Sequence, residues 1–144
     1  ILEYIPYRKD DYSALRDSTT IAHFAHHGYA CIRVDMRGSG SSDGVLHDEY
    51  TDEEIADGVA VIDWIAPQPW CNGLLATMGS SWGGITGLQL AQAAPDALNT
   101  VVILGATDQR YYDDAGYYVG CMVGQTLGWG PSCLATTRAH LVRP

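Results

Sequence analysis

The residues of this sequence with the clearest chemical potential are Gly79-Ser80-Ser81-Trp82-Gly83, which fit the pattern G-x-S-x-G. A short apolar run precedes them and a helix-compatible stretch follows, which is the setting of a nucleophile elbow. In such an elbow a sharp turn lifts the serine hydroxyl above the end of a sheet, while small flanking residues let strand and helix pass closely. The spacing predicts that Ser81 is a nucleophile. Ser80 is the competing serine, but the two glycines flank position 81 symmetrically.

The start of the helix that follows Ser81 would supply the group that stabilises negative charge. A helix N-terminus carries positive potential, and the backbone N–H of Trp82 can point at an oxyanion developing on an acyl carbonyl. The competing interpretation is an ordinary glycine-rich turn in which the serine caps the helix. Context favours the nucleophile.

The elements that would position this turn follow from hydrophobic periodicity and from turn residues. The runs 29–35 and 100–104 are continuously hydrophobic, as in strands buried on both faces, which implies a parallel sheet covered by helices. From Gly105 onward the periodicity is lost. The full expectation is strands at 1–5, 29–35, 74–78 and 100–104, and helices at 19–27 (capped by Asp17 or Ser18 and ended by Gly28), 52–66 and 85–94.

Composition excludes several classes of protein. The 144 residues fit one domain, with 47% hydrophobic and 17% charged residues for a core and a wettable surface. A net charge of −9 argues against a nucleic-acid partner. No apolar run approaches the roughly 18 residues of a membrane span. The four cysteines are widely spaced, which favours a reducing, cytoplasmic compartment over a zinc ribbon or a disulfide scaffold.

The ends of the sequence indicate a piece of a longer protein. The chain starts at Ile1, without Met, inside a strand-like run, and it stops at Pro144 without a closing element. We therefore expect a fold that is incomplete at both ends, and the lack of a signal peptide has no meaning.

Other polar groups suggest weaker alternatives. His23 and His27 share a helix face and could bind a metal, but no third ligand is evident, and histidines suit a helix C-terminus. The loop 38–44 follows a strand as in a flavodoxin-like nucleotide or phosphate binder, but its glycine spacing does not fit. We expect Asp35 and Arg37 to pin this loop, and we expect neither a metal nor a cofactor.

An acidic cluster marks the start of the helix expected at 52–66. Thr51 and Glu54 match a capping box, and carboxylates are stabilised at a helix N-terminus. The cluster is interpreted as a solvated face. The tryptophans outside the elbow, namely Trp64, Trp70 and Trp129, are expected to serve packing.

An ordered set of motifs over nearly the whole chain resembles the CocE/NonD family of serine hydrolases, which is related to X-Pro dipeptidyl-peptidases of the S15 type. The set is specific although no single motif is decisive. It comprises Glu3-Tyr4-Ile5-Pro6-Tyr7-Arg8-Lys9, Gly28-Tyr29-Ala30, Val34-Asp35-Met36-Arg37-Gly38-Ser39-Gly40, Asp48-Glu49-Tyr50, Gln68-Pro69-Trp70-Cys71-Asn72-Gly73, Gly79-Ser80-Ser81-Trp82-Gly83-Gly84, Thr107-Asp108, Arg110-Tyr111 and Asp113-Asp114.

The resemblance implies a partial α/β-hydrolase fold. Residues 1–108 would be part of the catalytic core, and residues 109–144 would begin the helical cap. It also implies that Ser81 is the nucleophile, that the Trp82 N–H forms half of the oxyanion hole, and that the Tyr7 hydroxyl forms the other half. Without the family, Tyr7 would be interpreted as a half-buried tyrosine after an edge strand. Asp113-Asp114 could line a pocket that favours an amine, or could be a solvated loop.

Departures from the family concern single positions and the triad. Ser41 stands where relatives often have an acid, and Ser80 where they usually have a bulkier apolar residue. The family's Asp and His would lie beyond this chain, and His140 comes too early after Ser81 to serve. The acids after Ser81 are Asp96, Asp108, Asp113 and Asp114.

The function expected is hydrolysis of a small-molecule ester or of an acyl-amide or X-Pro peptide bond through an acyl-enzyme on Ser81. The isolated chain would be nearly inactive because the triad is incomplete. The full-length protein could be a homo-oligomer. The alternative is a non-catalytic binding protein on a degenerate hydrolase scaffold.

Overall fold

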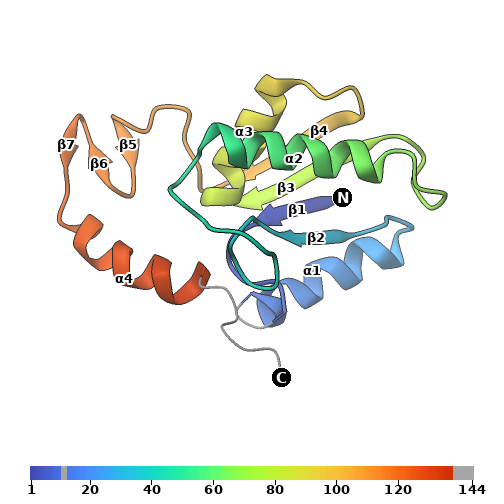
Figure 1. Ribbon diagram of the computed structural model, residues 1–144, viewed down its shortest axis with the longest axis horizontal. Coiled ribbons are helices and arrows are strands. Elements are labelled where there is room, and N and C mark those ends of the chain that lie inside the picture. The colour runs from blue at the N-terminus through green and yellow to red at the C-terminus, as the bar shows by residue number, and fades with distance from the viewer. Residues whose placement is uncertain (11–12, 138–144) are drawn as a thin grey trace.

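A four-stranded parallel sheet is the centre of the computed structural model, which describes residues 1–10 and 13–137 (Figure 1). Its strands are β1 (Leu2–Ile5), β2 (Ile32–Asp35), β3 (Leu75–Ser80) and β4 (Leu98–Leu104), in the order β2-β1-β3-β4. All three strand pairs are parallel. The expected α/β class and parallel sheet are confirmed.

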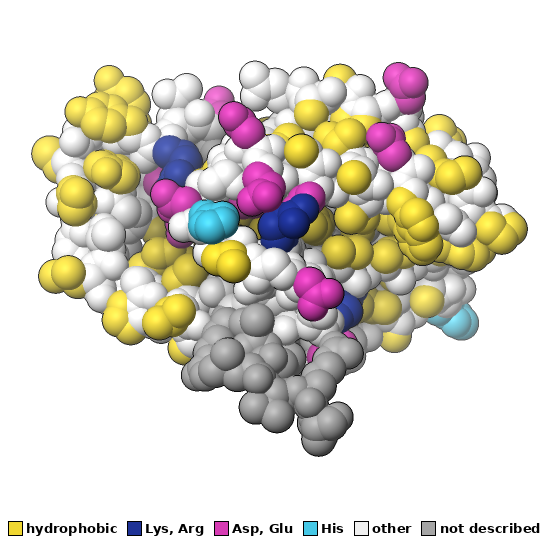
Figure 2. Space-filling model, viewed as in Figure 1, with side chains coloured by type: hydrophobic (Ala, Val, Ile, Leu, Met, Phe, Trp, Pro, Cys, Tyr) yellow, Lys and Arg dark blue, Asp and Glu magenta, His cyan; other side chains and the backbone are white. Residues whose placement is uncertain are grey.

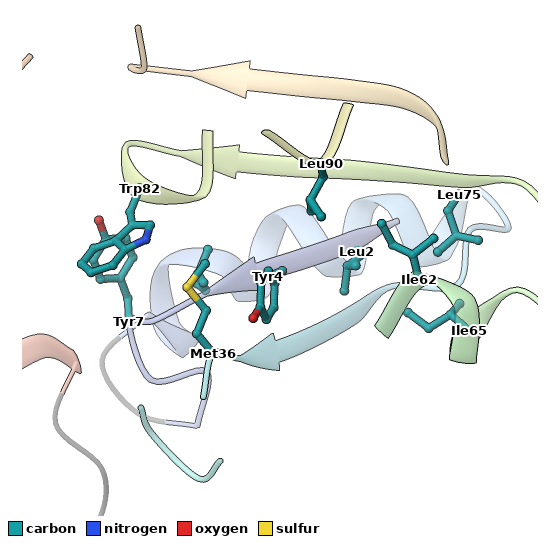
Figure 3. Close-up of a cluster of buried hydrophobic side chains, with 10 residues drawn as sticks. Leu2, Tyr4, Tyr7, Met36, Ile62, Ile65, Leu75, Trp82 and Leu90 are labelled. Carbon is teal, nitrogen blue, oxygen red and sulfur yellow. The ribbon is translucent and has the colours of Figure 1, made fainter. Parts of the chain in front are cut away.

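Helices cover both faces of this sheet. The helices α2 (Asp52–Ile65) and α3 (Trp82–Ala93) share one face, where a Cβ on Gly58 of α2 would touch Leu90 of α3 and Tyr4 of β1. The third helix, α1 (Ala14–His26), lies on the other face, behind the sheet in Figure 3. Because neighbouring strands are parallel, the carboxyl ends of all four strands lie at the same end of the sheet.

The core lies between β1, β3 and the helices of the first face (Figure 3). Such burial contributes about 1.5–3 kcal/mol for each large aliphatic side chain. The core is centred on nine side chains that are each at most 5% exposed, namely Leu2, Tyr4, Ile5, Met36, Ile62, Ile65, Leu75, Trp82 and Leu90.

The expectation that 29–35 and 100–104 are strands buried on both faces is wrong. Among residues 1–10 and 13–137, β2 and β4 are the two edges of the sheet, so each pairs with a single strand. Only Asp35 is buried in β2, and Val102 and Leu104 of β4 are 42% and 55% exposed. The hydrophobic runs correctly indicated strands, but the number of covering elements is not a local property.

Helix limits differ from the expectation mainly at α1. It begins at Ala14 rather than at residue 19, and Asp17 lies inside it. The Asp17 carboxylate accepts a hydrogen bond from Arg33 (2.6 Å) instead of capping the helix. Gly28, with φ +86°, follows the helix end as expected.

Residues beyond β4 form a small separate layer. β5 (Asp113–Asp114), β6 (Tyr117–Tyr118) and β7 (Cys121–Met122) make an antiparallel sheet, followed by α4 (Gln125–Thr137). Figure 2 shows hydrophobic side chains exposed over this layer. The division of the chain at residues 108 and 109 remains a prediction.

The tryptophan expectation is mostly wrong. Trp64 and Trp70 are 62% and 49% exposed, so they do not serve the core. Trp129 is partly buried and its indole N–H donates to Glu49 (3.0 Å).

Across residues 1–10 and 13–137, no helix has the length and hydrophobicity needed to cross a bilayer.

Candidate active site

Ser81 lies at the junction of β3 and α3 in a strained conformation. Its φ of +55° and ψ of −118° fall in a region that costs a non-glycine residue about 1–3 kcal/mol. The backbone is held there because its N–H donates to the Leu104 carbonyl (2.9 Å) and its carbonyl accepts from Gly84 (2.9 Å). The chain turns sharply at Ser81, as a nucleophile elbow requires.

Three glycines let this turn exist. A Cβ on Gly79 would overlap the Gly83 carbonyl, and one on Gly83 would lie 2.7 Å from Cγ2 of Ile5. A Cβ on Gly84 would lie 2.7 Å from Cβ of Ala106. At these glycines β3, α3 and β1 therefore approach more closely than any side chain would allow. The sequence analysis predicted this close approach from the glycines on either side of Ser81.

The Ser81 side chain is exposed and makes no capping hydrogen bond to α3. The helix-capping interpretation is therefore wrong. Ser80 is also exposed, but it is the last residue of β3 and continues the strand register opposite Leu104. Only Ser81 stands at the strained turn.

Tyr7 reaches the same place from the loop after β1. It is buried, and burial raises the pKa of its phenol, while the adjacent Ser81 side chain and Trp82 backbone act to lower that pKa. Within the described part of the chain, its hydroxyl has no partner with hydrogen-bond geometry. The phenol therefore lies beside the serine, and its raised pKa keeps it protonated at neutral pH.

Trp82 is the first residue of α3, and its indole lies at the same end of the core cluster as Tyr7 (Figure 3). First-turn N–H groups of a helix have no partner within the helix. The structure thus brings together Ser81, Tyr7 and Trp82, which the sequence analysis had selected.

Glu54 is the residue that sequence reasoning missed. It belongs to the acidic cluster interpreted as a solvated face, yet it is only 4% exposed, so that interpretation is wrong for Glu54. Its carboxylate accepts the indole N–H of Trp82 (3.1 and 3.2 Å) and the hydroxyl of Thr86 (2.6 Å). The sequence held one signal of such a buried acceptor: Trp82 and Thr86 are two hydrogen-bond donors one helical turn apart.

Two other acids near the site are engaged in ion pairs. Arg110 donates to Glu49 (3.1 Å) and to Asp114 (2.8 Å), and its guanidinium lies 4.2 Å from the centre of the Tyr50 ring. Figure 2 shows acidic side chains lying among basic ones over this region. Asp114 is therefore ion-paired, whereas Asp113 is exposed.

The loop 38–44 is pinned from within. Asp35 accepts the backbone N–H groups of Ser41 (3.0 Å) and Lys9 (2.7 Å), as expected for a structural role. Arg37 instead pairs with Asp57 of α2 (2.6 Å). The Asp35 carboxylate also pairs with the Lys9 ammonium (3.2 Å), so these polar groups are engaged in holding the loop in place.

The histidine expectations have separate outcomes. The His23 and His27 rings lie 4.4 Å apart, and the described residues contain no group of three side chains suited to a metal. His140 lies outside the described residues.

Ser81 is strained and stands between the carboxyl end of a parallel strand and the start of a helix, in a sheet that helices cover on both faces. This arrangement defines an α/β-hydrolase fold with an elbow of the nucleophile type. Residues 1–142 match the X-Pro dipeptidyl-peptidase (S15) family, and the chain belongs to that family. The resemblance stated from the sequence is thereby confirmed.

Similar proteins agree with this assignment. The cocaine esterase of Rhodococcus sp. (strain MB1 Bresler) is 32% identical over 129 residues, covering 86% of this chain and 22% of that protein. A protein of Mycobacterium bovis (strain ATCC BAA-935 / AF2122/97), provisionally named a serine esterase, is 49% identical over 61 residues, covering 42% of this chain and 10% of that protein.

A solved CocE/NonD family hydrolase from Staphylococcus aureus matches 96% of this chain with a TM-score of 0.78. Its sequence identity is 23%, so this likeness supports the fold alone. The chain spans at most 28% of the length of these relatives.

Proposed function

We propose that the protein carrying this chain is a serine hydrolase that cleaves small-molecule carboxylic esters or acyl-amide and X-Pro peptide bonds. The observation that carries the proposal is the strained, exposed Ser81 beside two hydrogen-bond donors, the Tyr7 hydroxyl and the Trp82 N–H. The relatives named as esterases and the S15 family support the same chemistry.

In the proposed reaction the Ser81 hydroxyl attacks the acyl carbonyl carbon and gives its proton to a histidine base. The carbonyl oxygen becomes an oxyanion, which accepts hydrogen bonds from Tyr7 and Trp82. Collapse expels the alcohol or amine, which takes the proton, and leaves an acyl-enzyme that water then hydrolyses. A phenol suits this role because the raised pKa of Tyr7 keeps it a neutral donor.

The base and its orienting acid would come from the rest of the protein. We propose that residues 1–137 supply the nucleophile and oxyanion donors, and that the chain alone has only residual activity. In other serine hydrolases, an enzyme that has lost triad members still accelerates the reaction about 10³- to 10⁴-fold over water. This rate is far below that of an enzyme with an intact triad.

The test uses the natural full-length reading frame that encodes this chain. Turnover of p-nitrophenyl acetate and of Gly-Pro-p-nitroanilide is measured for the wild type, for Ser81→Ala and for the matched control Ser80→Ala. We expect Ser81→Ala to abolish turnover of the preferred substrate and Ser80→Ala to retain it. A fluorophosphonate should label Ser81 stoichiometrically. Turnover that survives Ser81→Ala, or is absent from the wild type, would favour the non-catalytic binding protein.

A further inference from the structure

A buried carboxylate joins the two helices that cover the active-site face of the sheet. Glu54 lies in the first turn of α2, and both of its oxygens accept hydrogen bonds. Oε1 accepts from Thr86 Oγ1 (2.6 Å) and Trp82 Nε1 (3.1 Å). Oε2 accepts from Trp82 Nε1 (3.2 Å) and from the Tyr50 backbone N–H (3.0 Å). An indole N–H and a backbone N–H can only donate, so an ionised carboxylate fits this site.

Capping of α2 does not explain this carboxylate. In a capping box the acid side chain would return to the backbone N–H of Thr51. Here the hydroxyl of Thr51 accepts the N–H of Glu54 (3.2 Å), but the Glu54 side chain goes to Tyr50 and α3. Gly58, one turn later, has no side chain to separate α2 from Leu90. The close approach of the helices lets Glu54 reach α3.

The residues that Glu54 binds are those that fix the elbow. Trp82 and Thr86 are one turn apart at the start of α3, so one carboxylate ties down that whole turn. The peptide N–H of Trp82 directly follows Ser81, and a rotation of Trp82 would turn that N–H away from the oxyanion. Strain at Ser81 persists only while its surroundings hold it.

Stability is a poor reason for burying this charge. Desolvation of a carboxylate costs several kcal/mol, and apolar replacements of buried ionic groups are often neutral or stabilising. Burial raises the pKa of Glu54 although hydrogen bonds from Thr86, Trp82 and Tyr50 act to lower it. Burial of a carboxyl at this cost points to a functional role, because groups with perturbed pKa values cluster at functional sites.

We propose that Glu54 is a positioning residue of the hydrolase: by holding Trp82 and Thr86 at the start of α3, it aims the Trp82 N–H at the oxyanion and keeps Ser81 in its strained conformation. This inference rests on the proposed function. Glu54 touches neither substrate nor the reacting atoms, and it acts through Trp82.

The experiment compares three variants of the full-length protein with the wild type. Glu54→Gln keeps the shape of the side chain but replaces one accepting oxygen with an amide NH₂, which cannot accept hydrogen bonds from Trp82 and Thr86. Thr86→Val removes one donor without changing the volume. Asp57→Asn is the matched control, because Asp57 lies on the same helix and pairs with Arg37 rather than with α3. Steady-state ester hydrolysis and thermal unfolding are measured for each.

We expect Glu54→Gln to lower kcat by about 10- to 100-fold, as for supporting residues around other catalytic groups, with KM unchanged. Thr86→Val should lower kcat less and in the same direction, while Asp57→Asn retains wild-type kcat. If Glu54→Gln does not fold, the kcat of the Thr86→Val protein tests the inference instead.

Two results would overturn the inference while the proposed function stands. One is wild-type kcat in the folded Glu54→Gln or Thr86→Val protein. The other is a loss of activity that appears only as a raised KM or a collapsed unfolding temperature, which marks a structural role. Absence of Ser81-dependent turnover in the wild type is a separate result, and it would overturn both the proposed function and this inference.

Discussion

The site that we propose has two oxyanion donors of different kinds beside Ser81. The Trp82 N–H belongs to the backbone, so its direction depends on how α3 starts and no single side-chain change removes it. The Tyr7 hydroxyl belongs to a side chain, so it can be deleted alone. Its burial and the lack of a formed hydrogen bond within the described residues leave it free to strengthen a bond in the transition state.

Tyr7→Phe in the full-length protein should lower kcat by about 100- to 1,000-fold, the usual effect of removing one oxyanion donor, with little change in KM. Steady-state hydrolysis of an activated ester checks this. Tyr29→Phe is the control, because Tyr29 is 56% exposed. A Tyr7→Phe enzyme with wild-type kcat would remove Tyr7 from the site.

The origin of each site residue limits how far the sequence could predict it. Ser81 and Trp82 are adjacent, so a local motif with a strand before it and a helix after it was sufficient to place both residues at the strained turn. Tyr7 is 74 positions from Ser81, and only the family resemblance selected it. Glu54 was misinterpreted because burial of one acid in an acidic cluster depends on the packing of α2 against α3, which no local pattern records.

At the scale of the elements, the elbow is a packing problem among β3, α3 and β1. Gly83 is where α3 passes β1, and an added methyl group would press on the side chain of Ile5. Overpacking of this kind costs about 1–3 kcal/mol. The same displacement would move the residues that follow Ser81.

Gly83→Ala should therefore lower the unfolding midpoint and reduce kcat together. Gly128→Ala in α4 is the matched control: nothing lies within 4 Å of its added Cβ, and replacing a helical glycine stabilises by about 0.5–1 kcal/mol. Urea unfolding and ester hydrolysis check both variants. Equal midpoints for the two alanine variants would contradict the close packing of α3 on β1.

Element type was more predictable than element limits. The capped, amphipathic stretch 52–66 became α2, Asp52–Ile65, because a local hydrogen bond to Thr51 starts it and prolines follow it. The start of α1 was placed late because Asp17 resembles a cap. Its carboxylate instead pairs with the neighbouring Arg16 and with Arg33, which lies on a strand 16 residues away. Long-range ion pairs of this kind leave no periodic signal.

At the scale of the whole molecule, two carboxyls that folding removes from water contribute to the pH dependence of stability. Burial raises the pKa of Glu54, and also that of Glu3, above the ordinary value of 4.5. A carboxyl whose pKa is raised by folding holds its proton more tightly in the folded state. Its contribution to stability is therefore full below 4.5 and is lost as pH rises through the raised value.

Glu54→Gln should consequently gain stability relative to the wild type as pH rises from about 4 to about 7, because glutamine does not titrate. Urea unfolding midpoints of both proteins across that range check the prediction. Asp57→Asn, which leaves Glu54 in place, should show no such gain. A gap between Glu54→Gln and wild type that narrows with rising pH would contradict the direction given for Glu54.

The β4 edge of the sheet should determine whether the isolated 144-residue chain self-associates. β4 presents an unpaired strand edge among the described residues, with Val102 and Leu104 exposed. Unprotected edges pair with other chains, and a lysine on the edge opposes that pairing. We expect the isolated chain to self-associate with rising concentration and Val102→Lys to weaken the association. Val45→Lys, at an equally apolar but loop position 59% exposed, should not. Sedimentation velocity measures all three, and equal effects of both lysines would assign the association to general hydrophobicity instead of to the β4 edge.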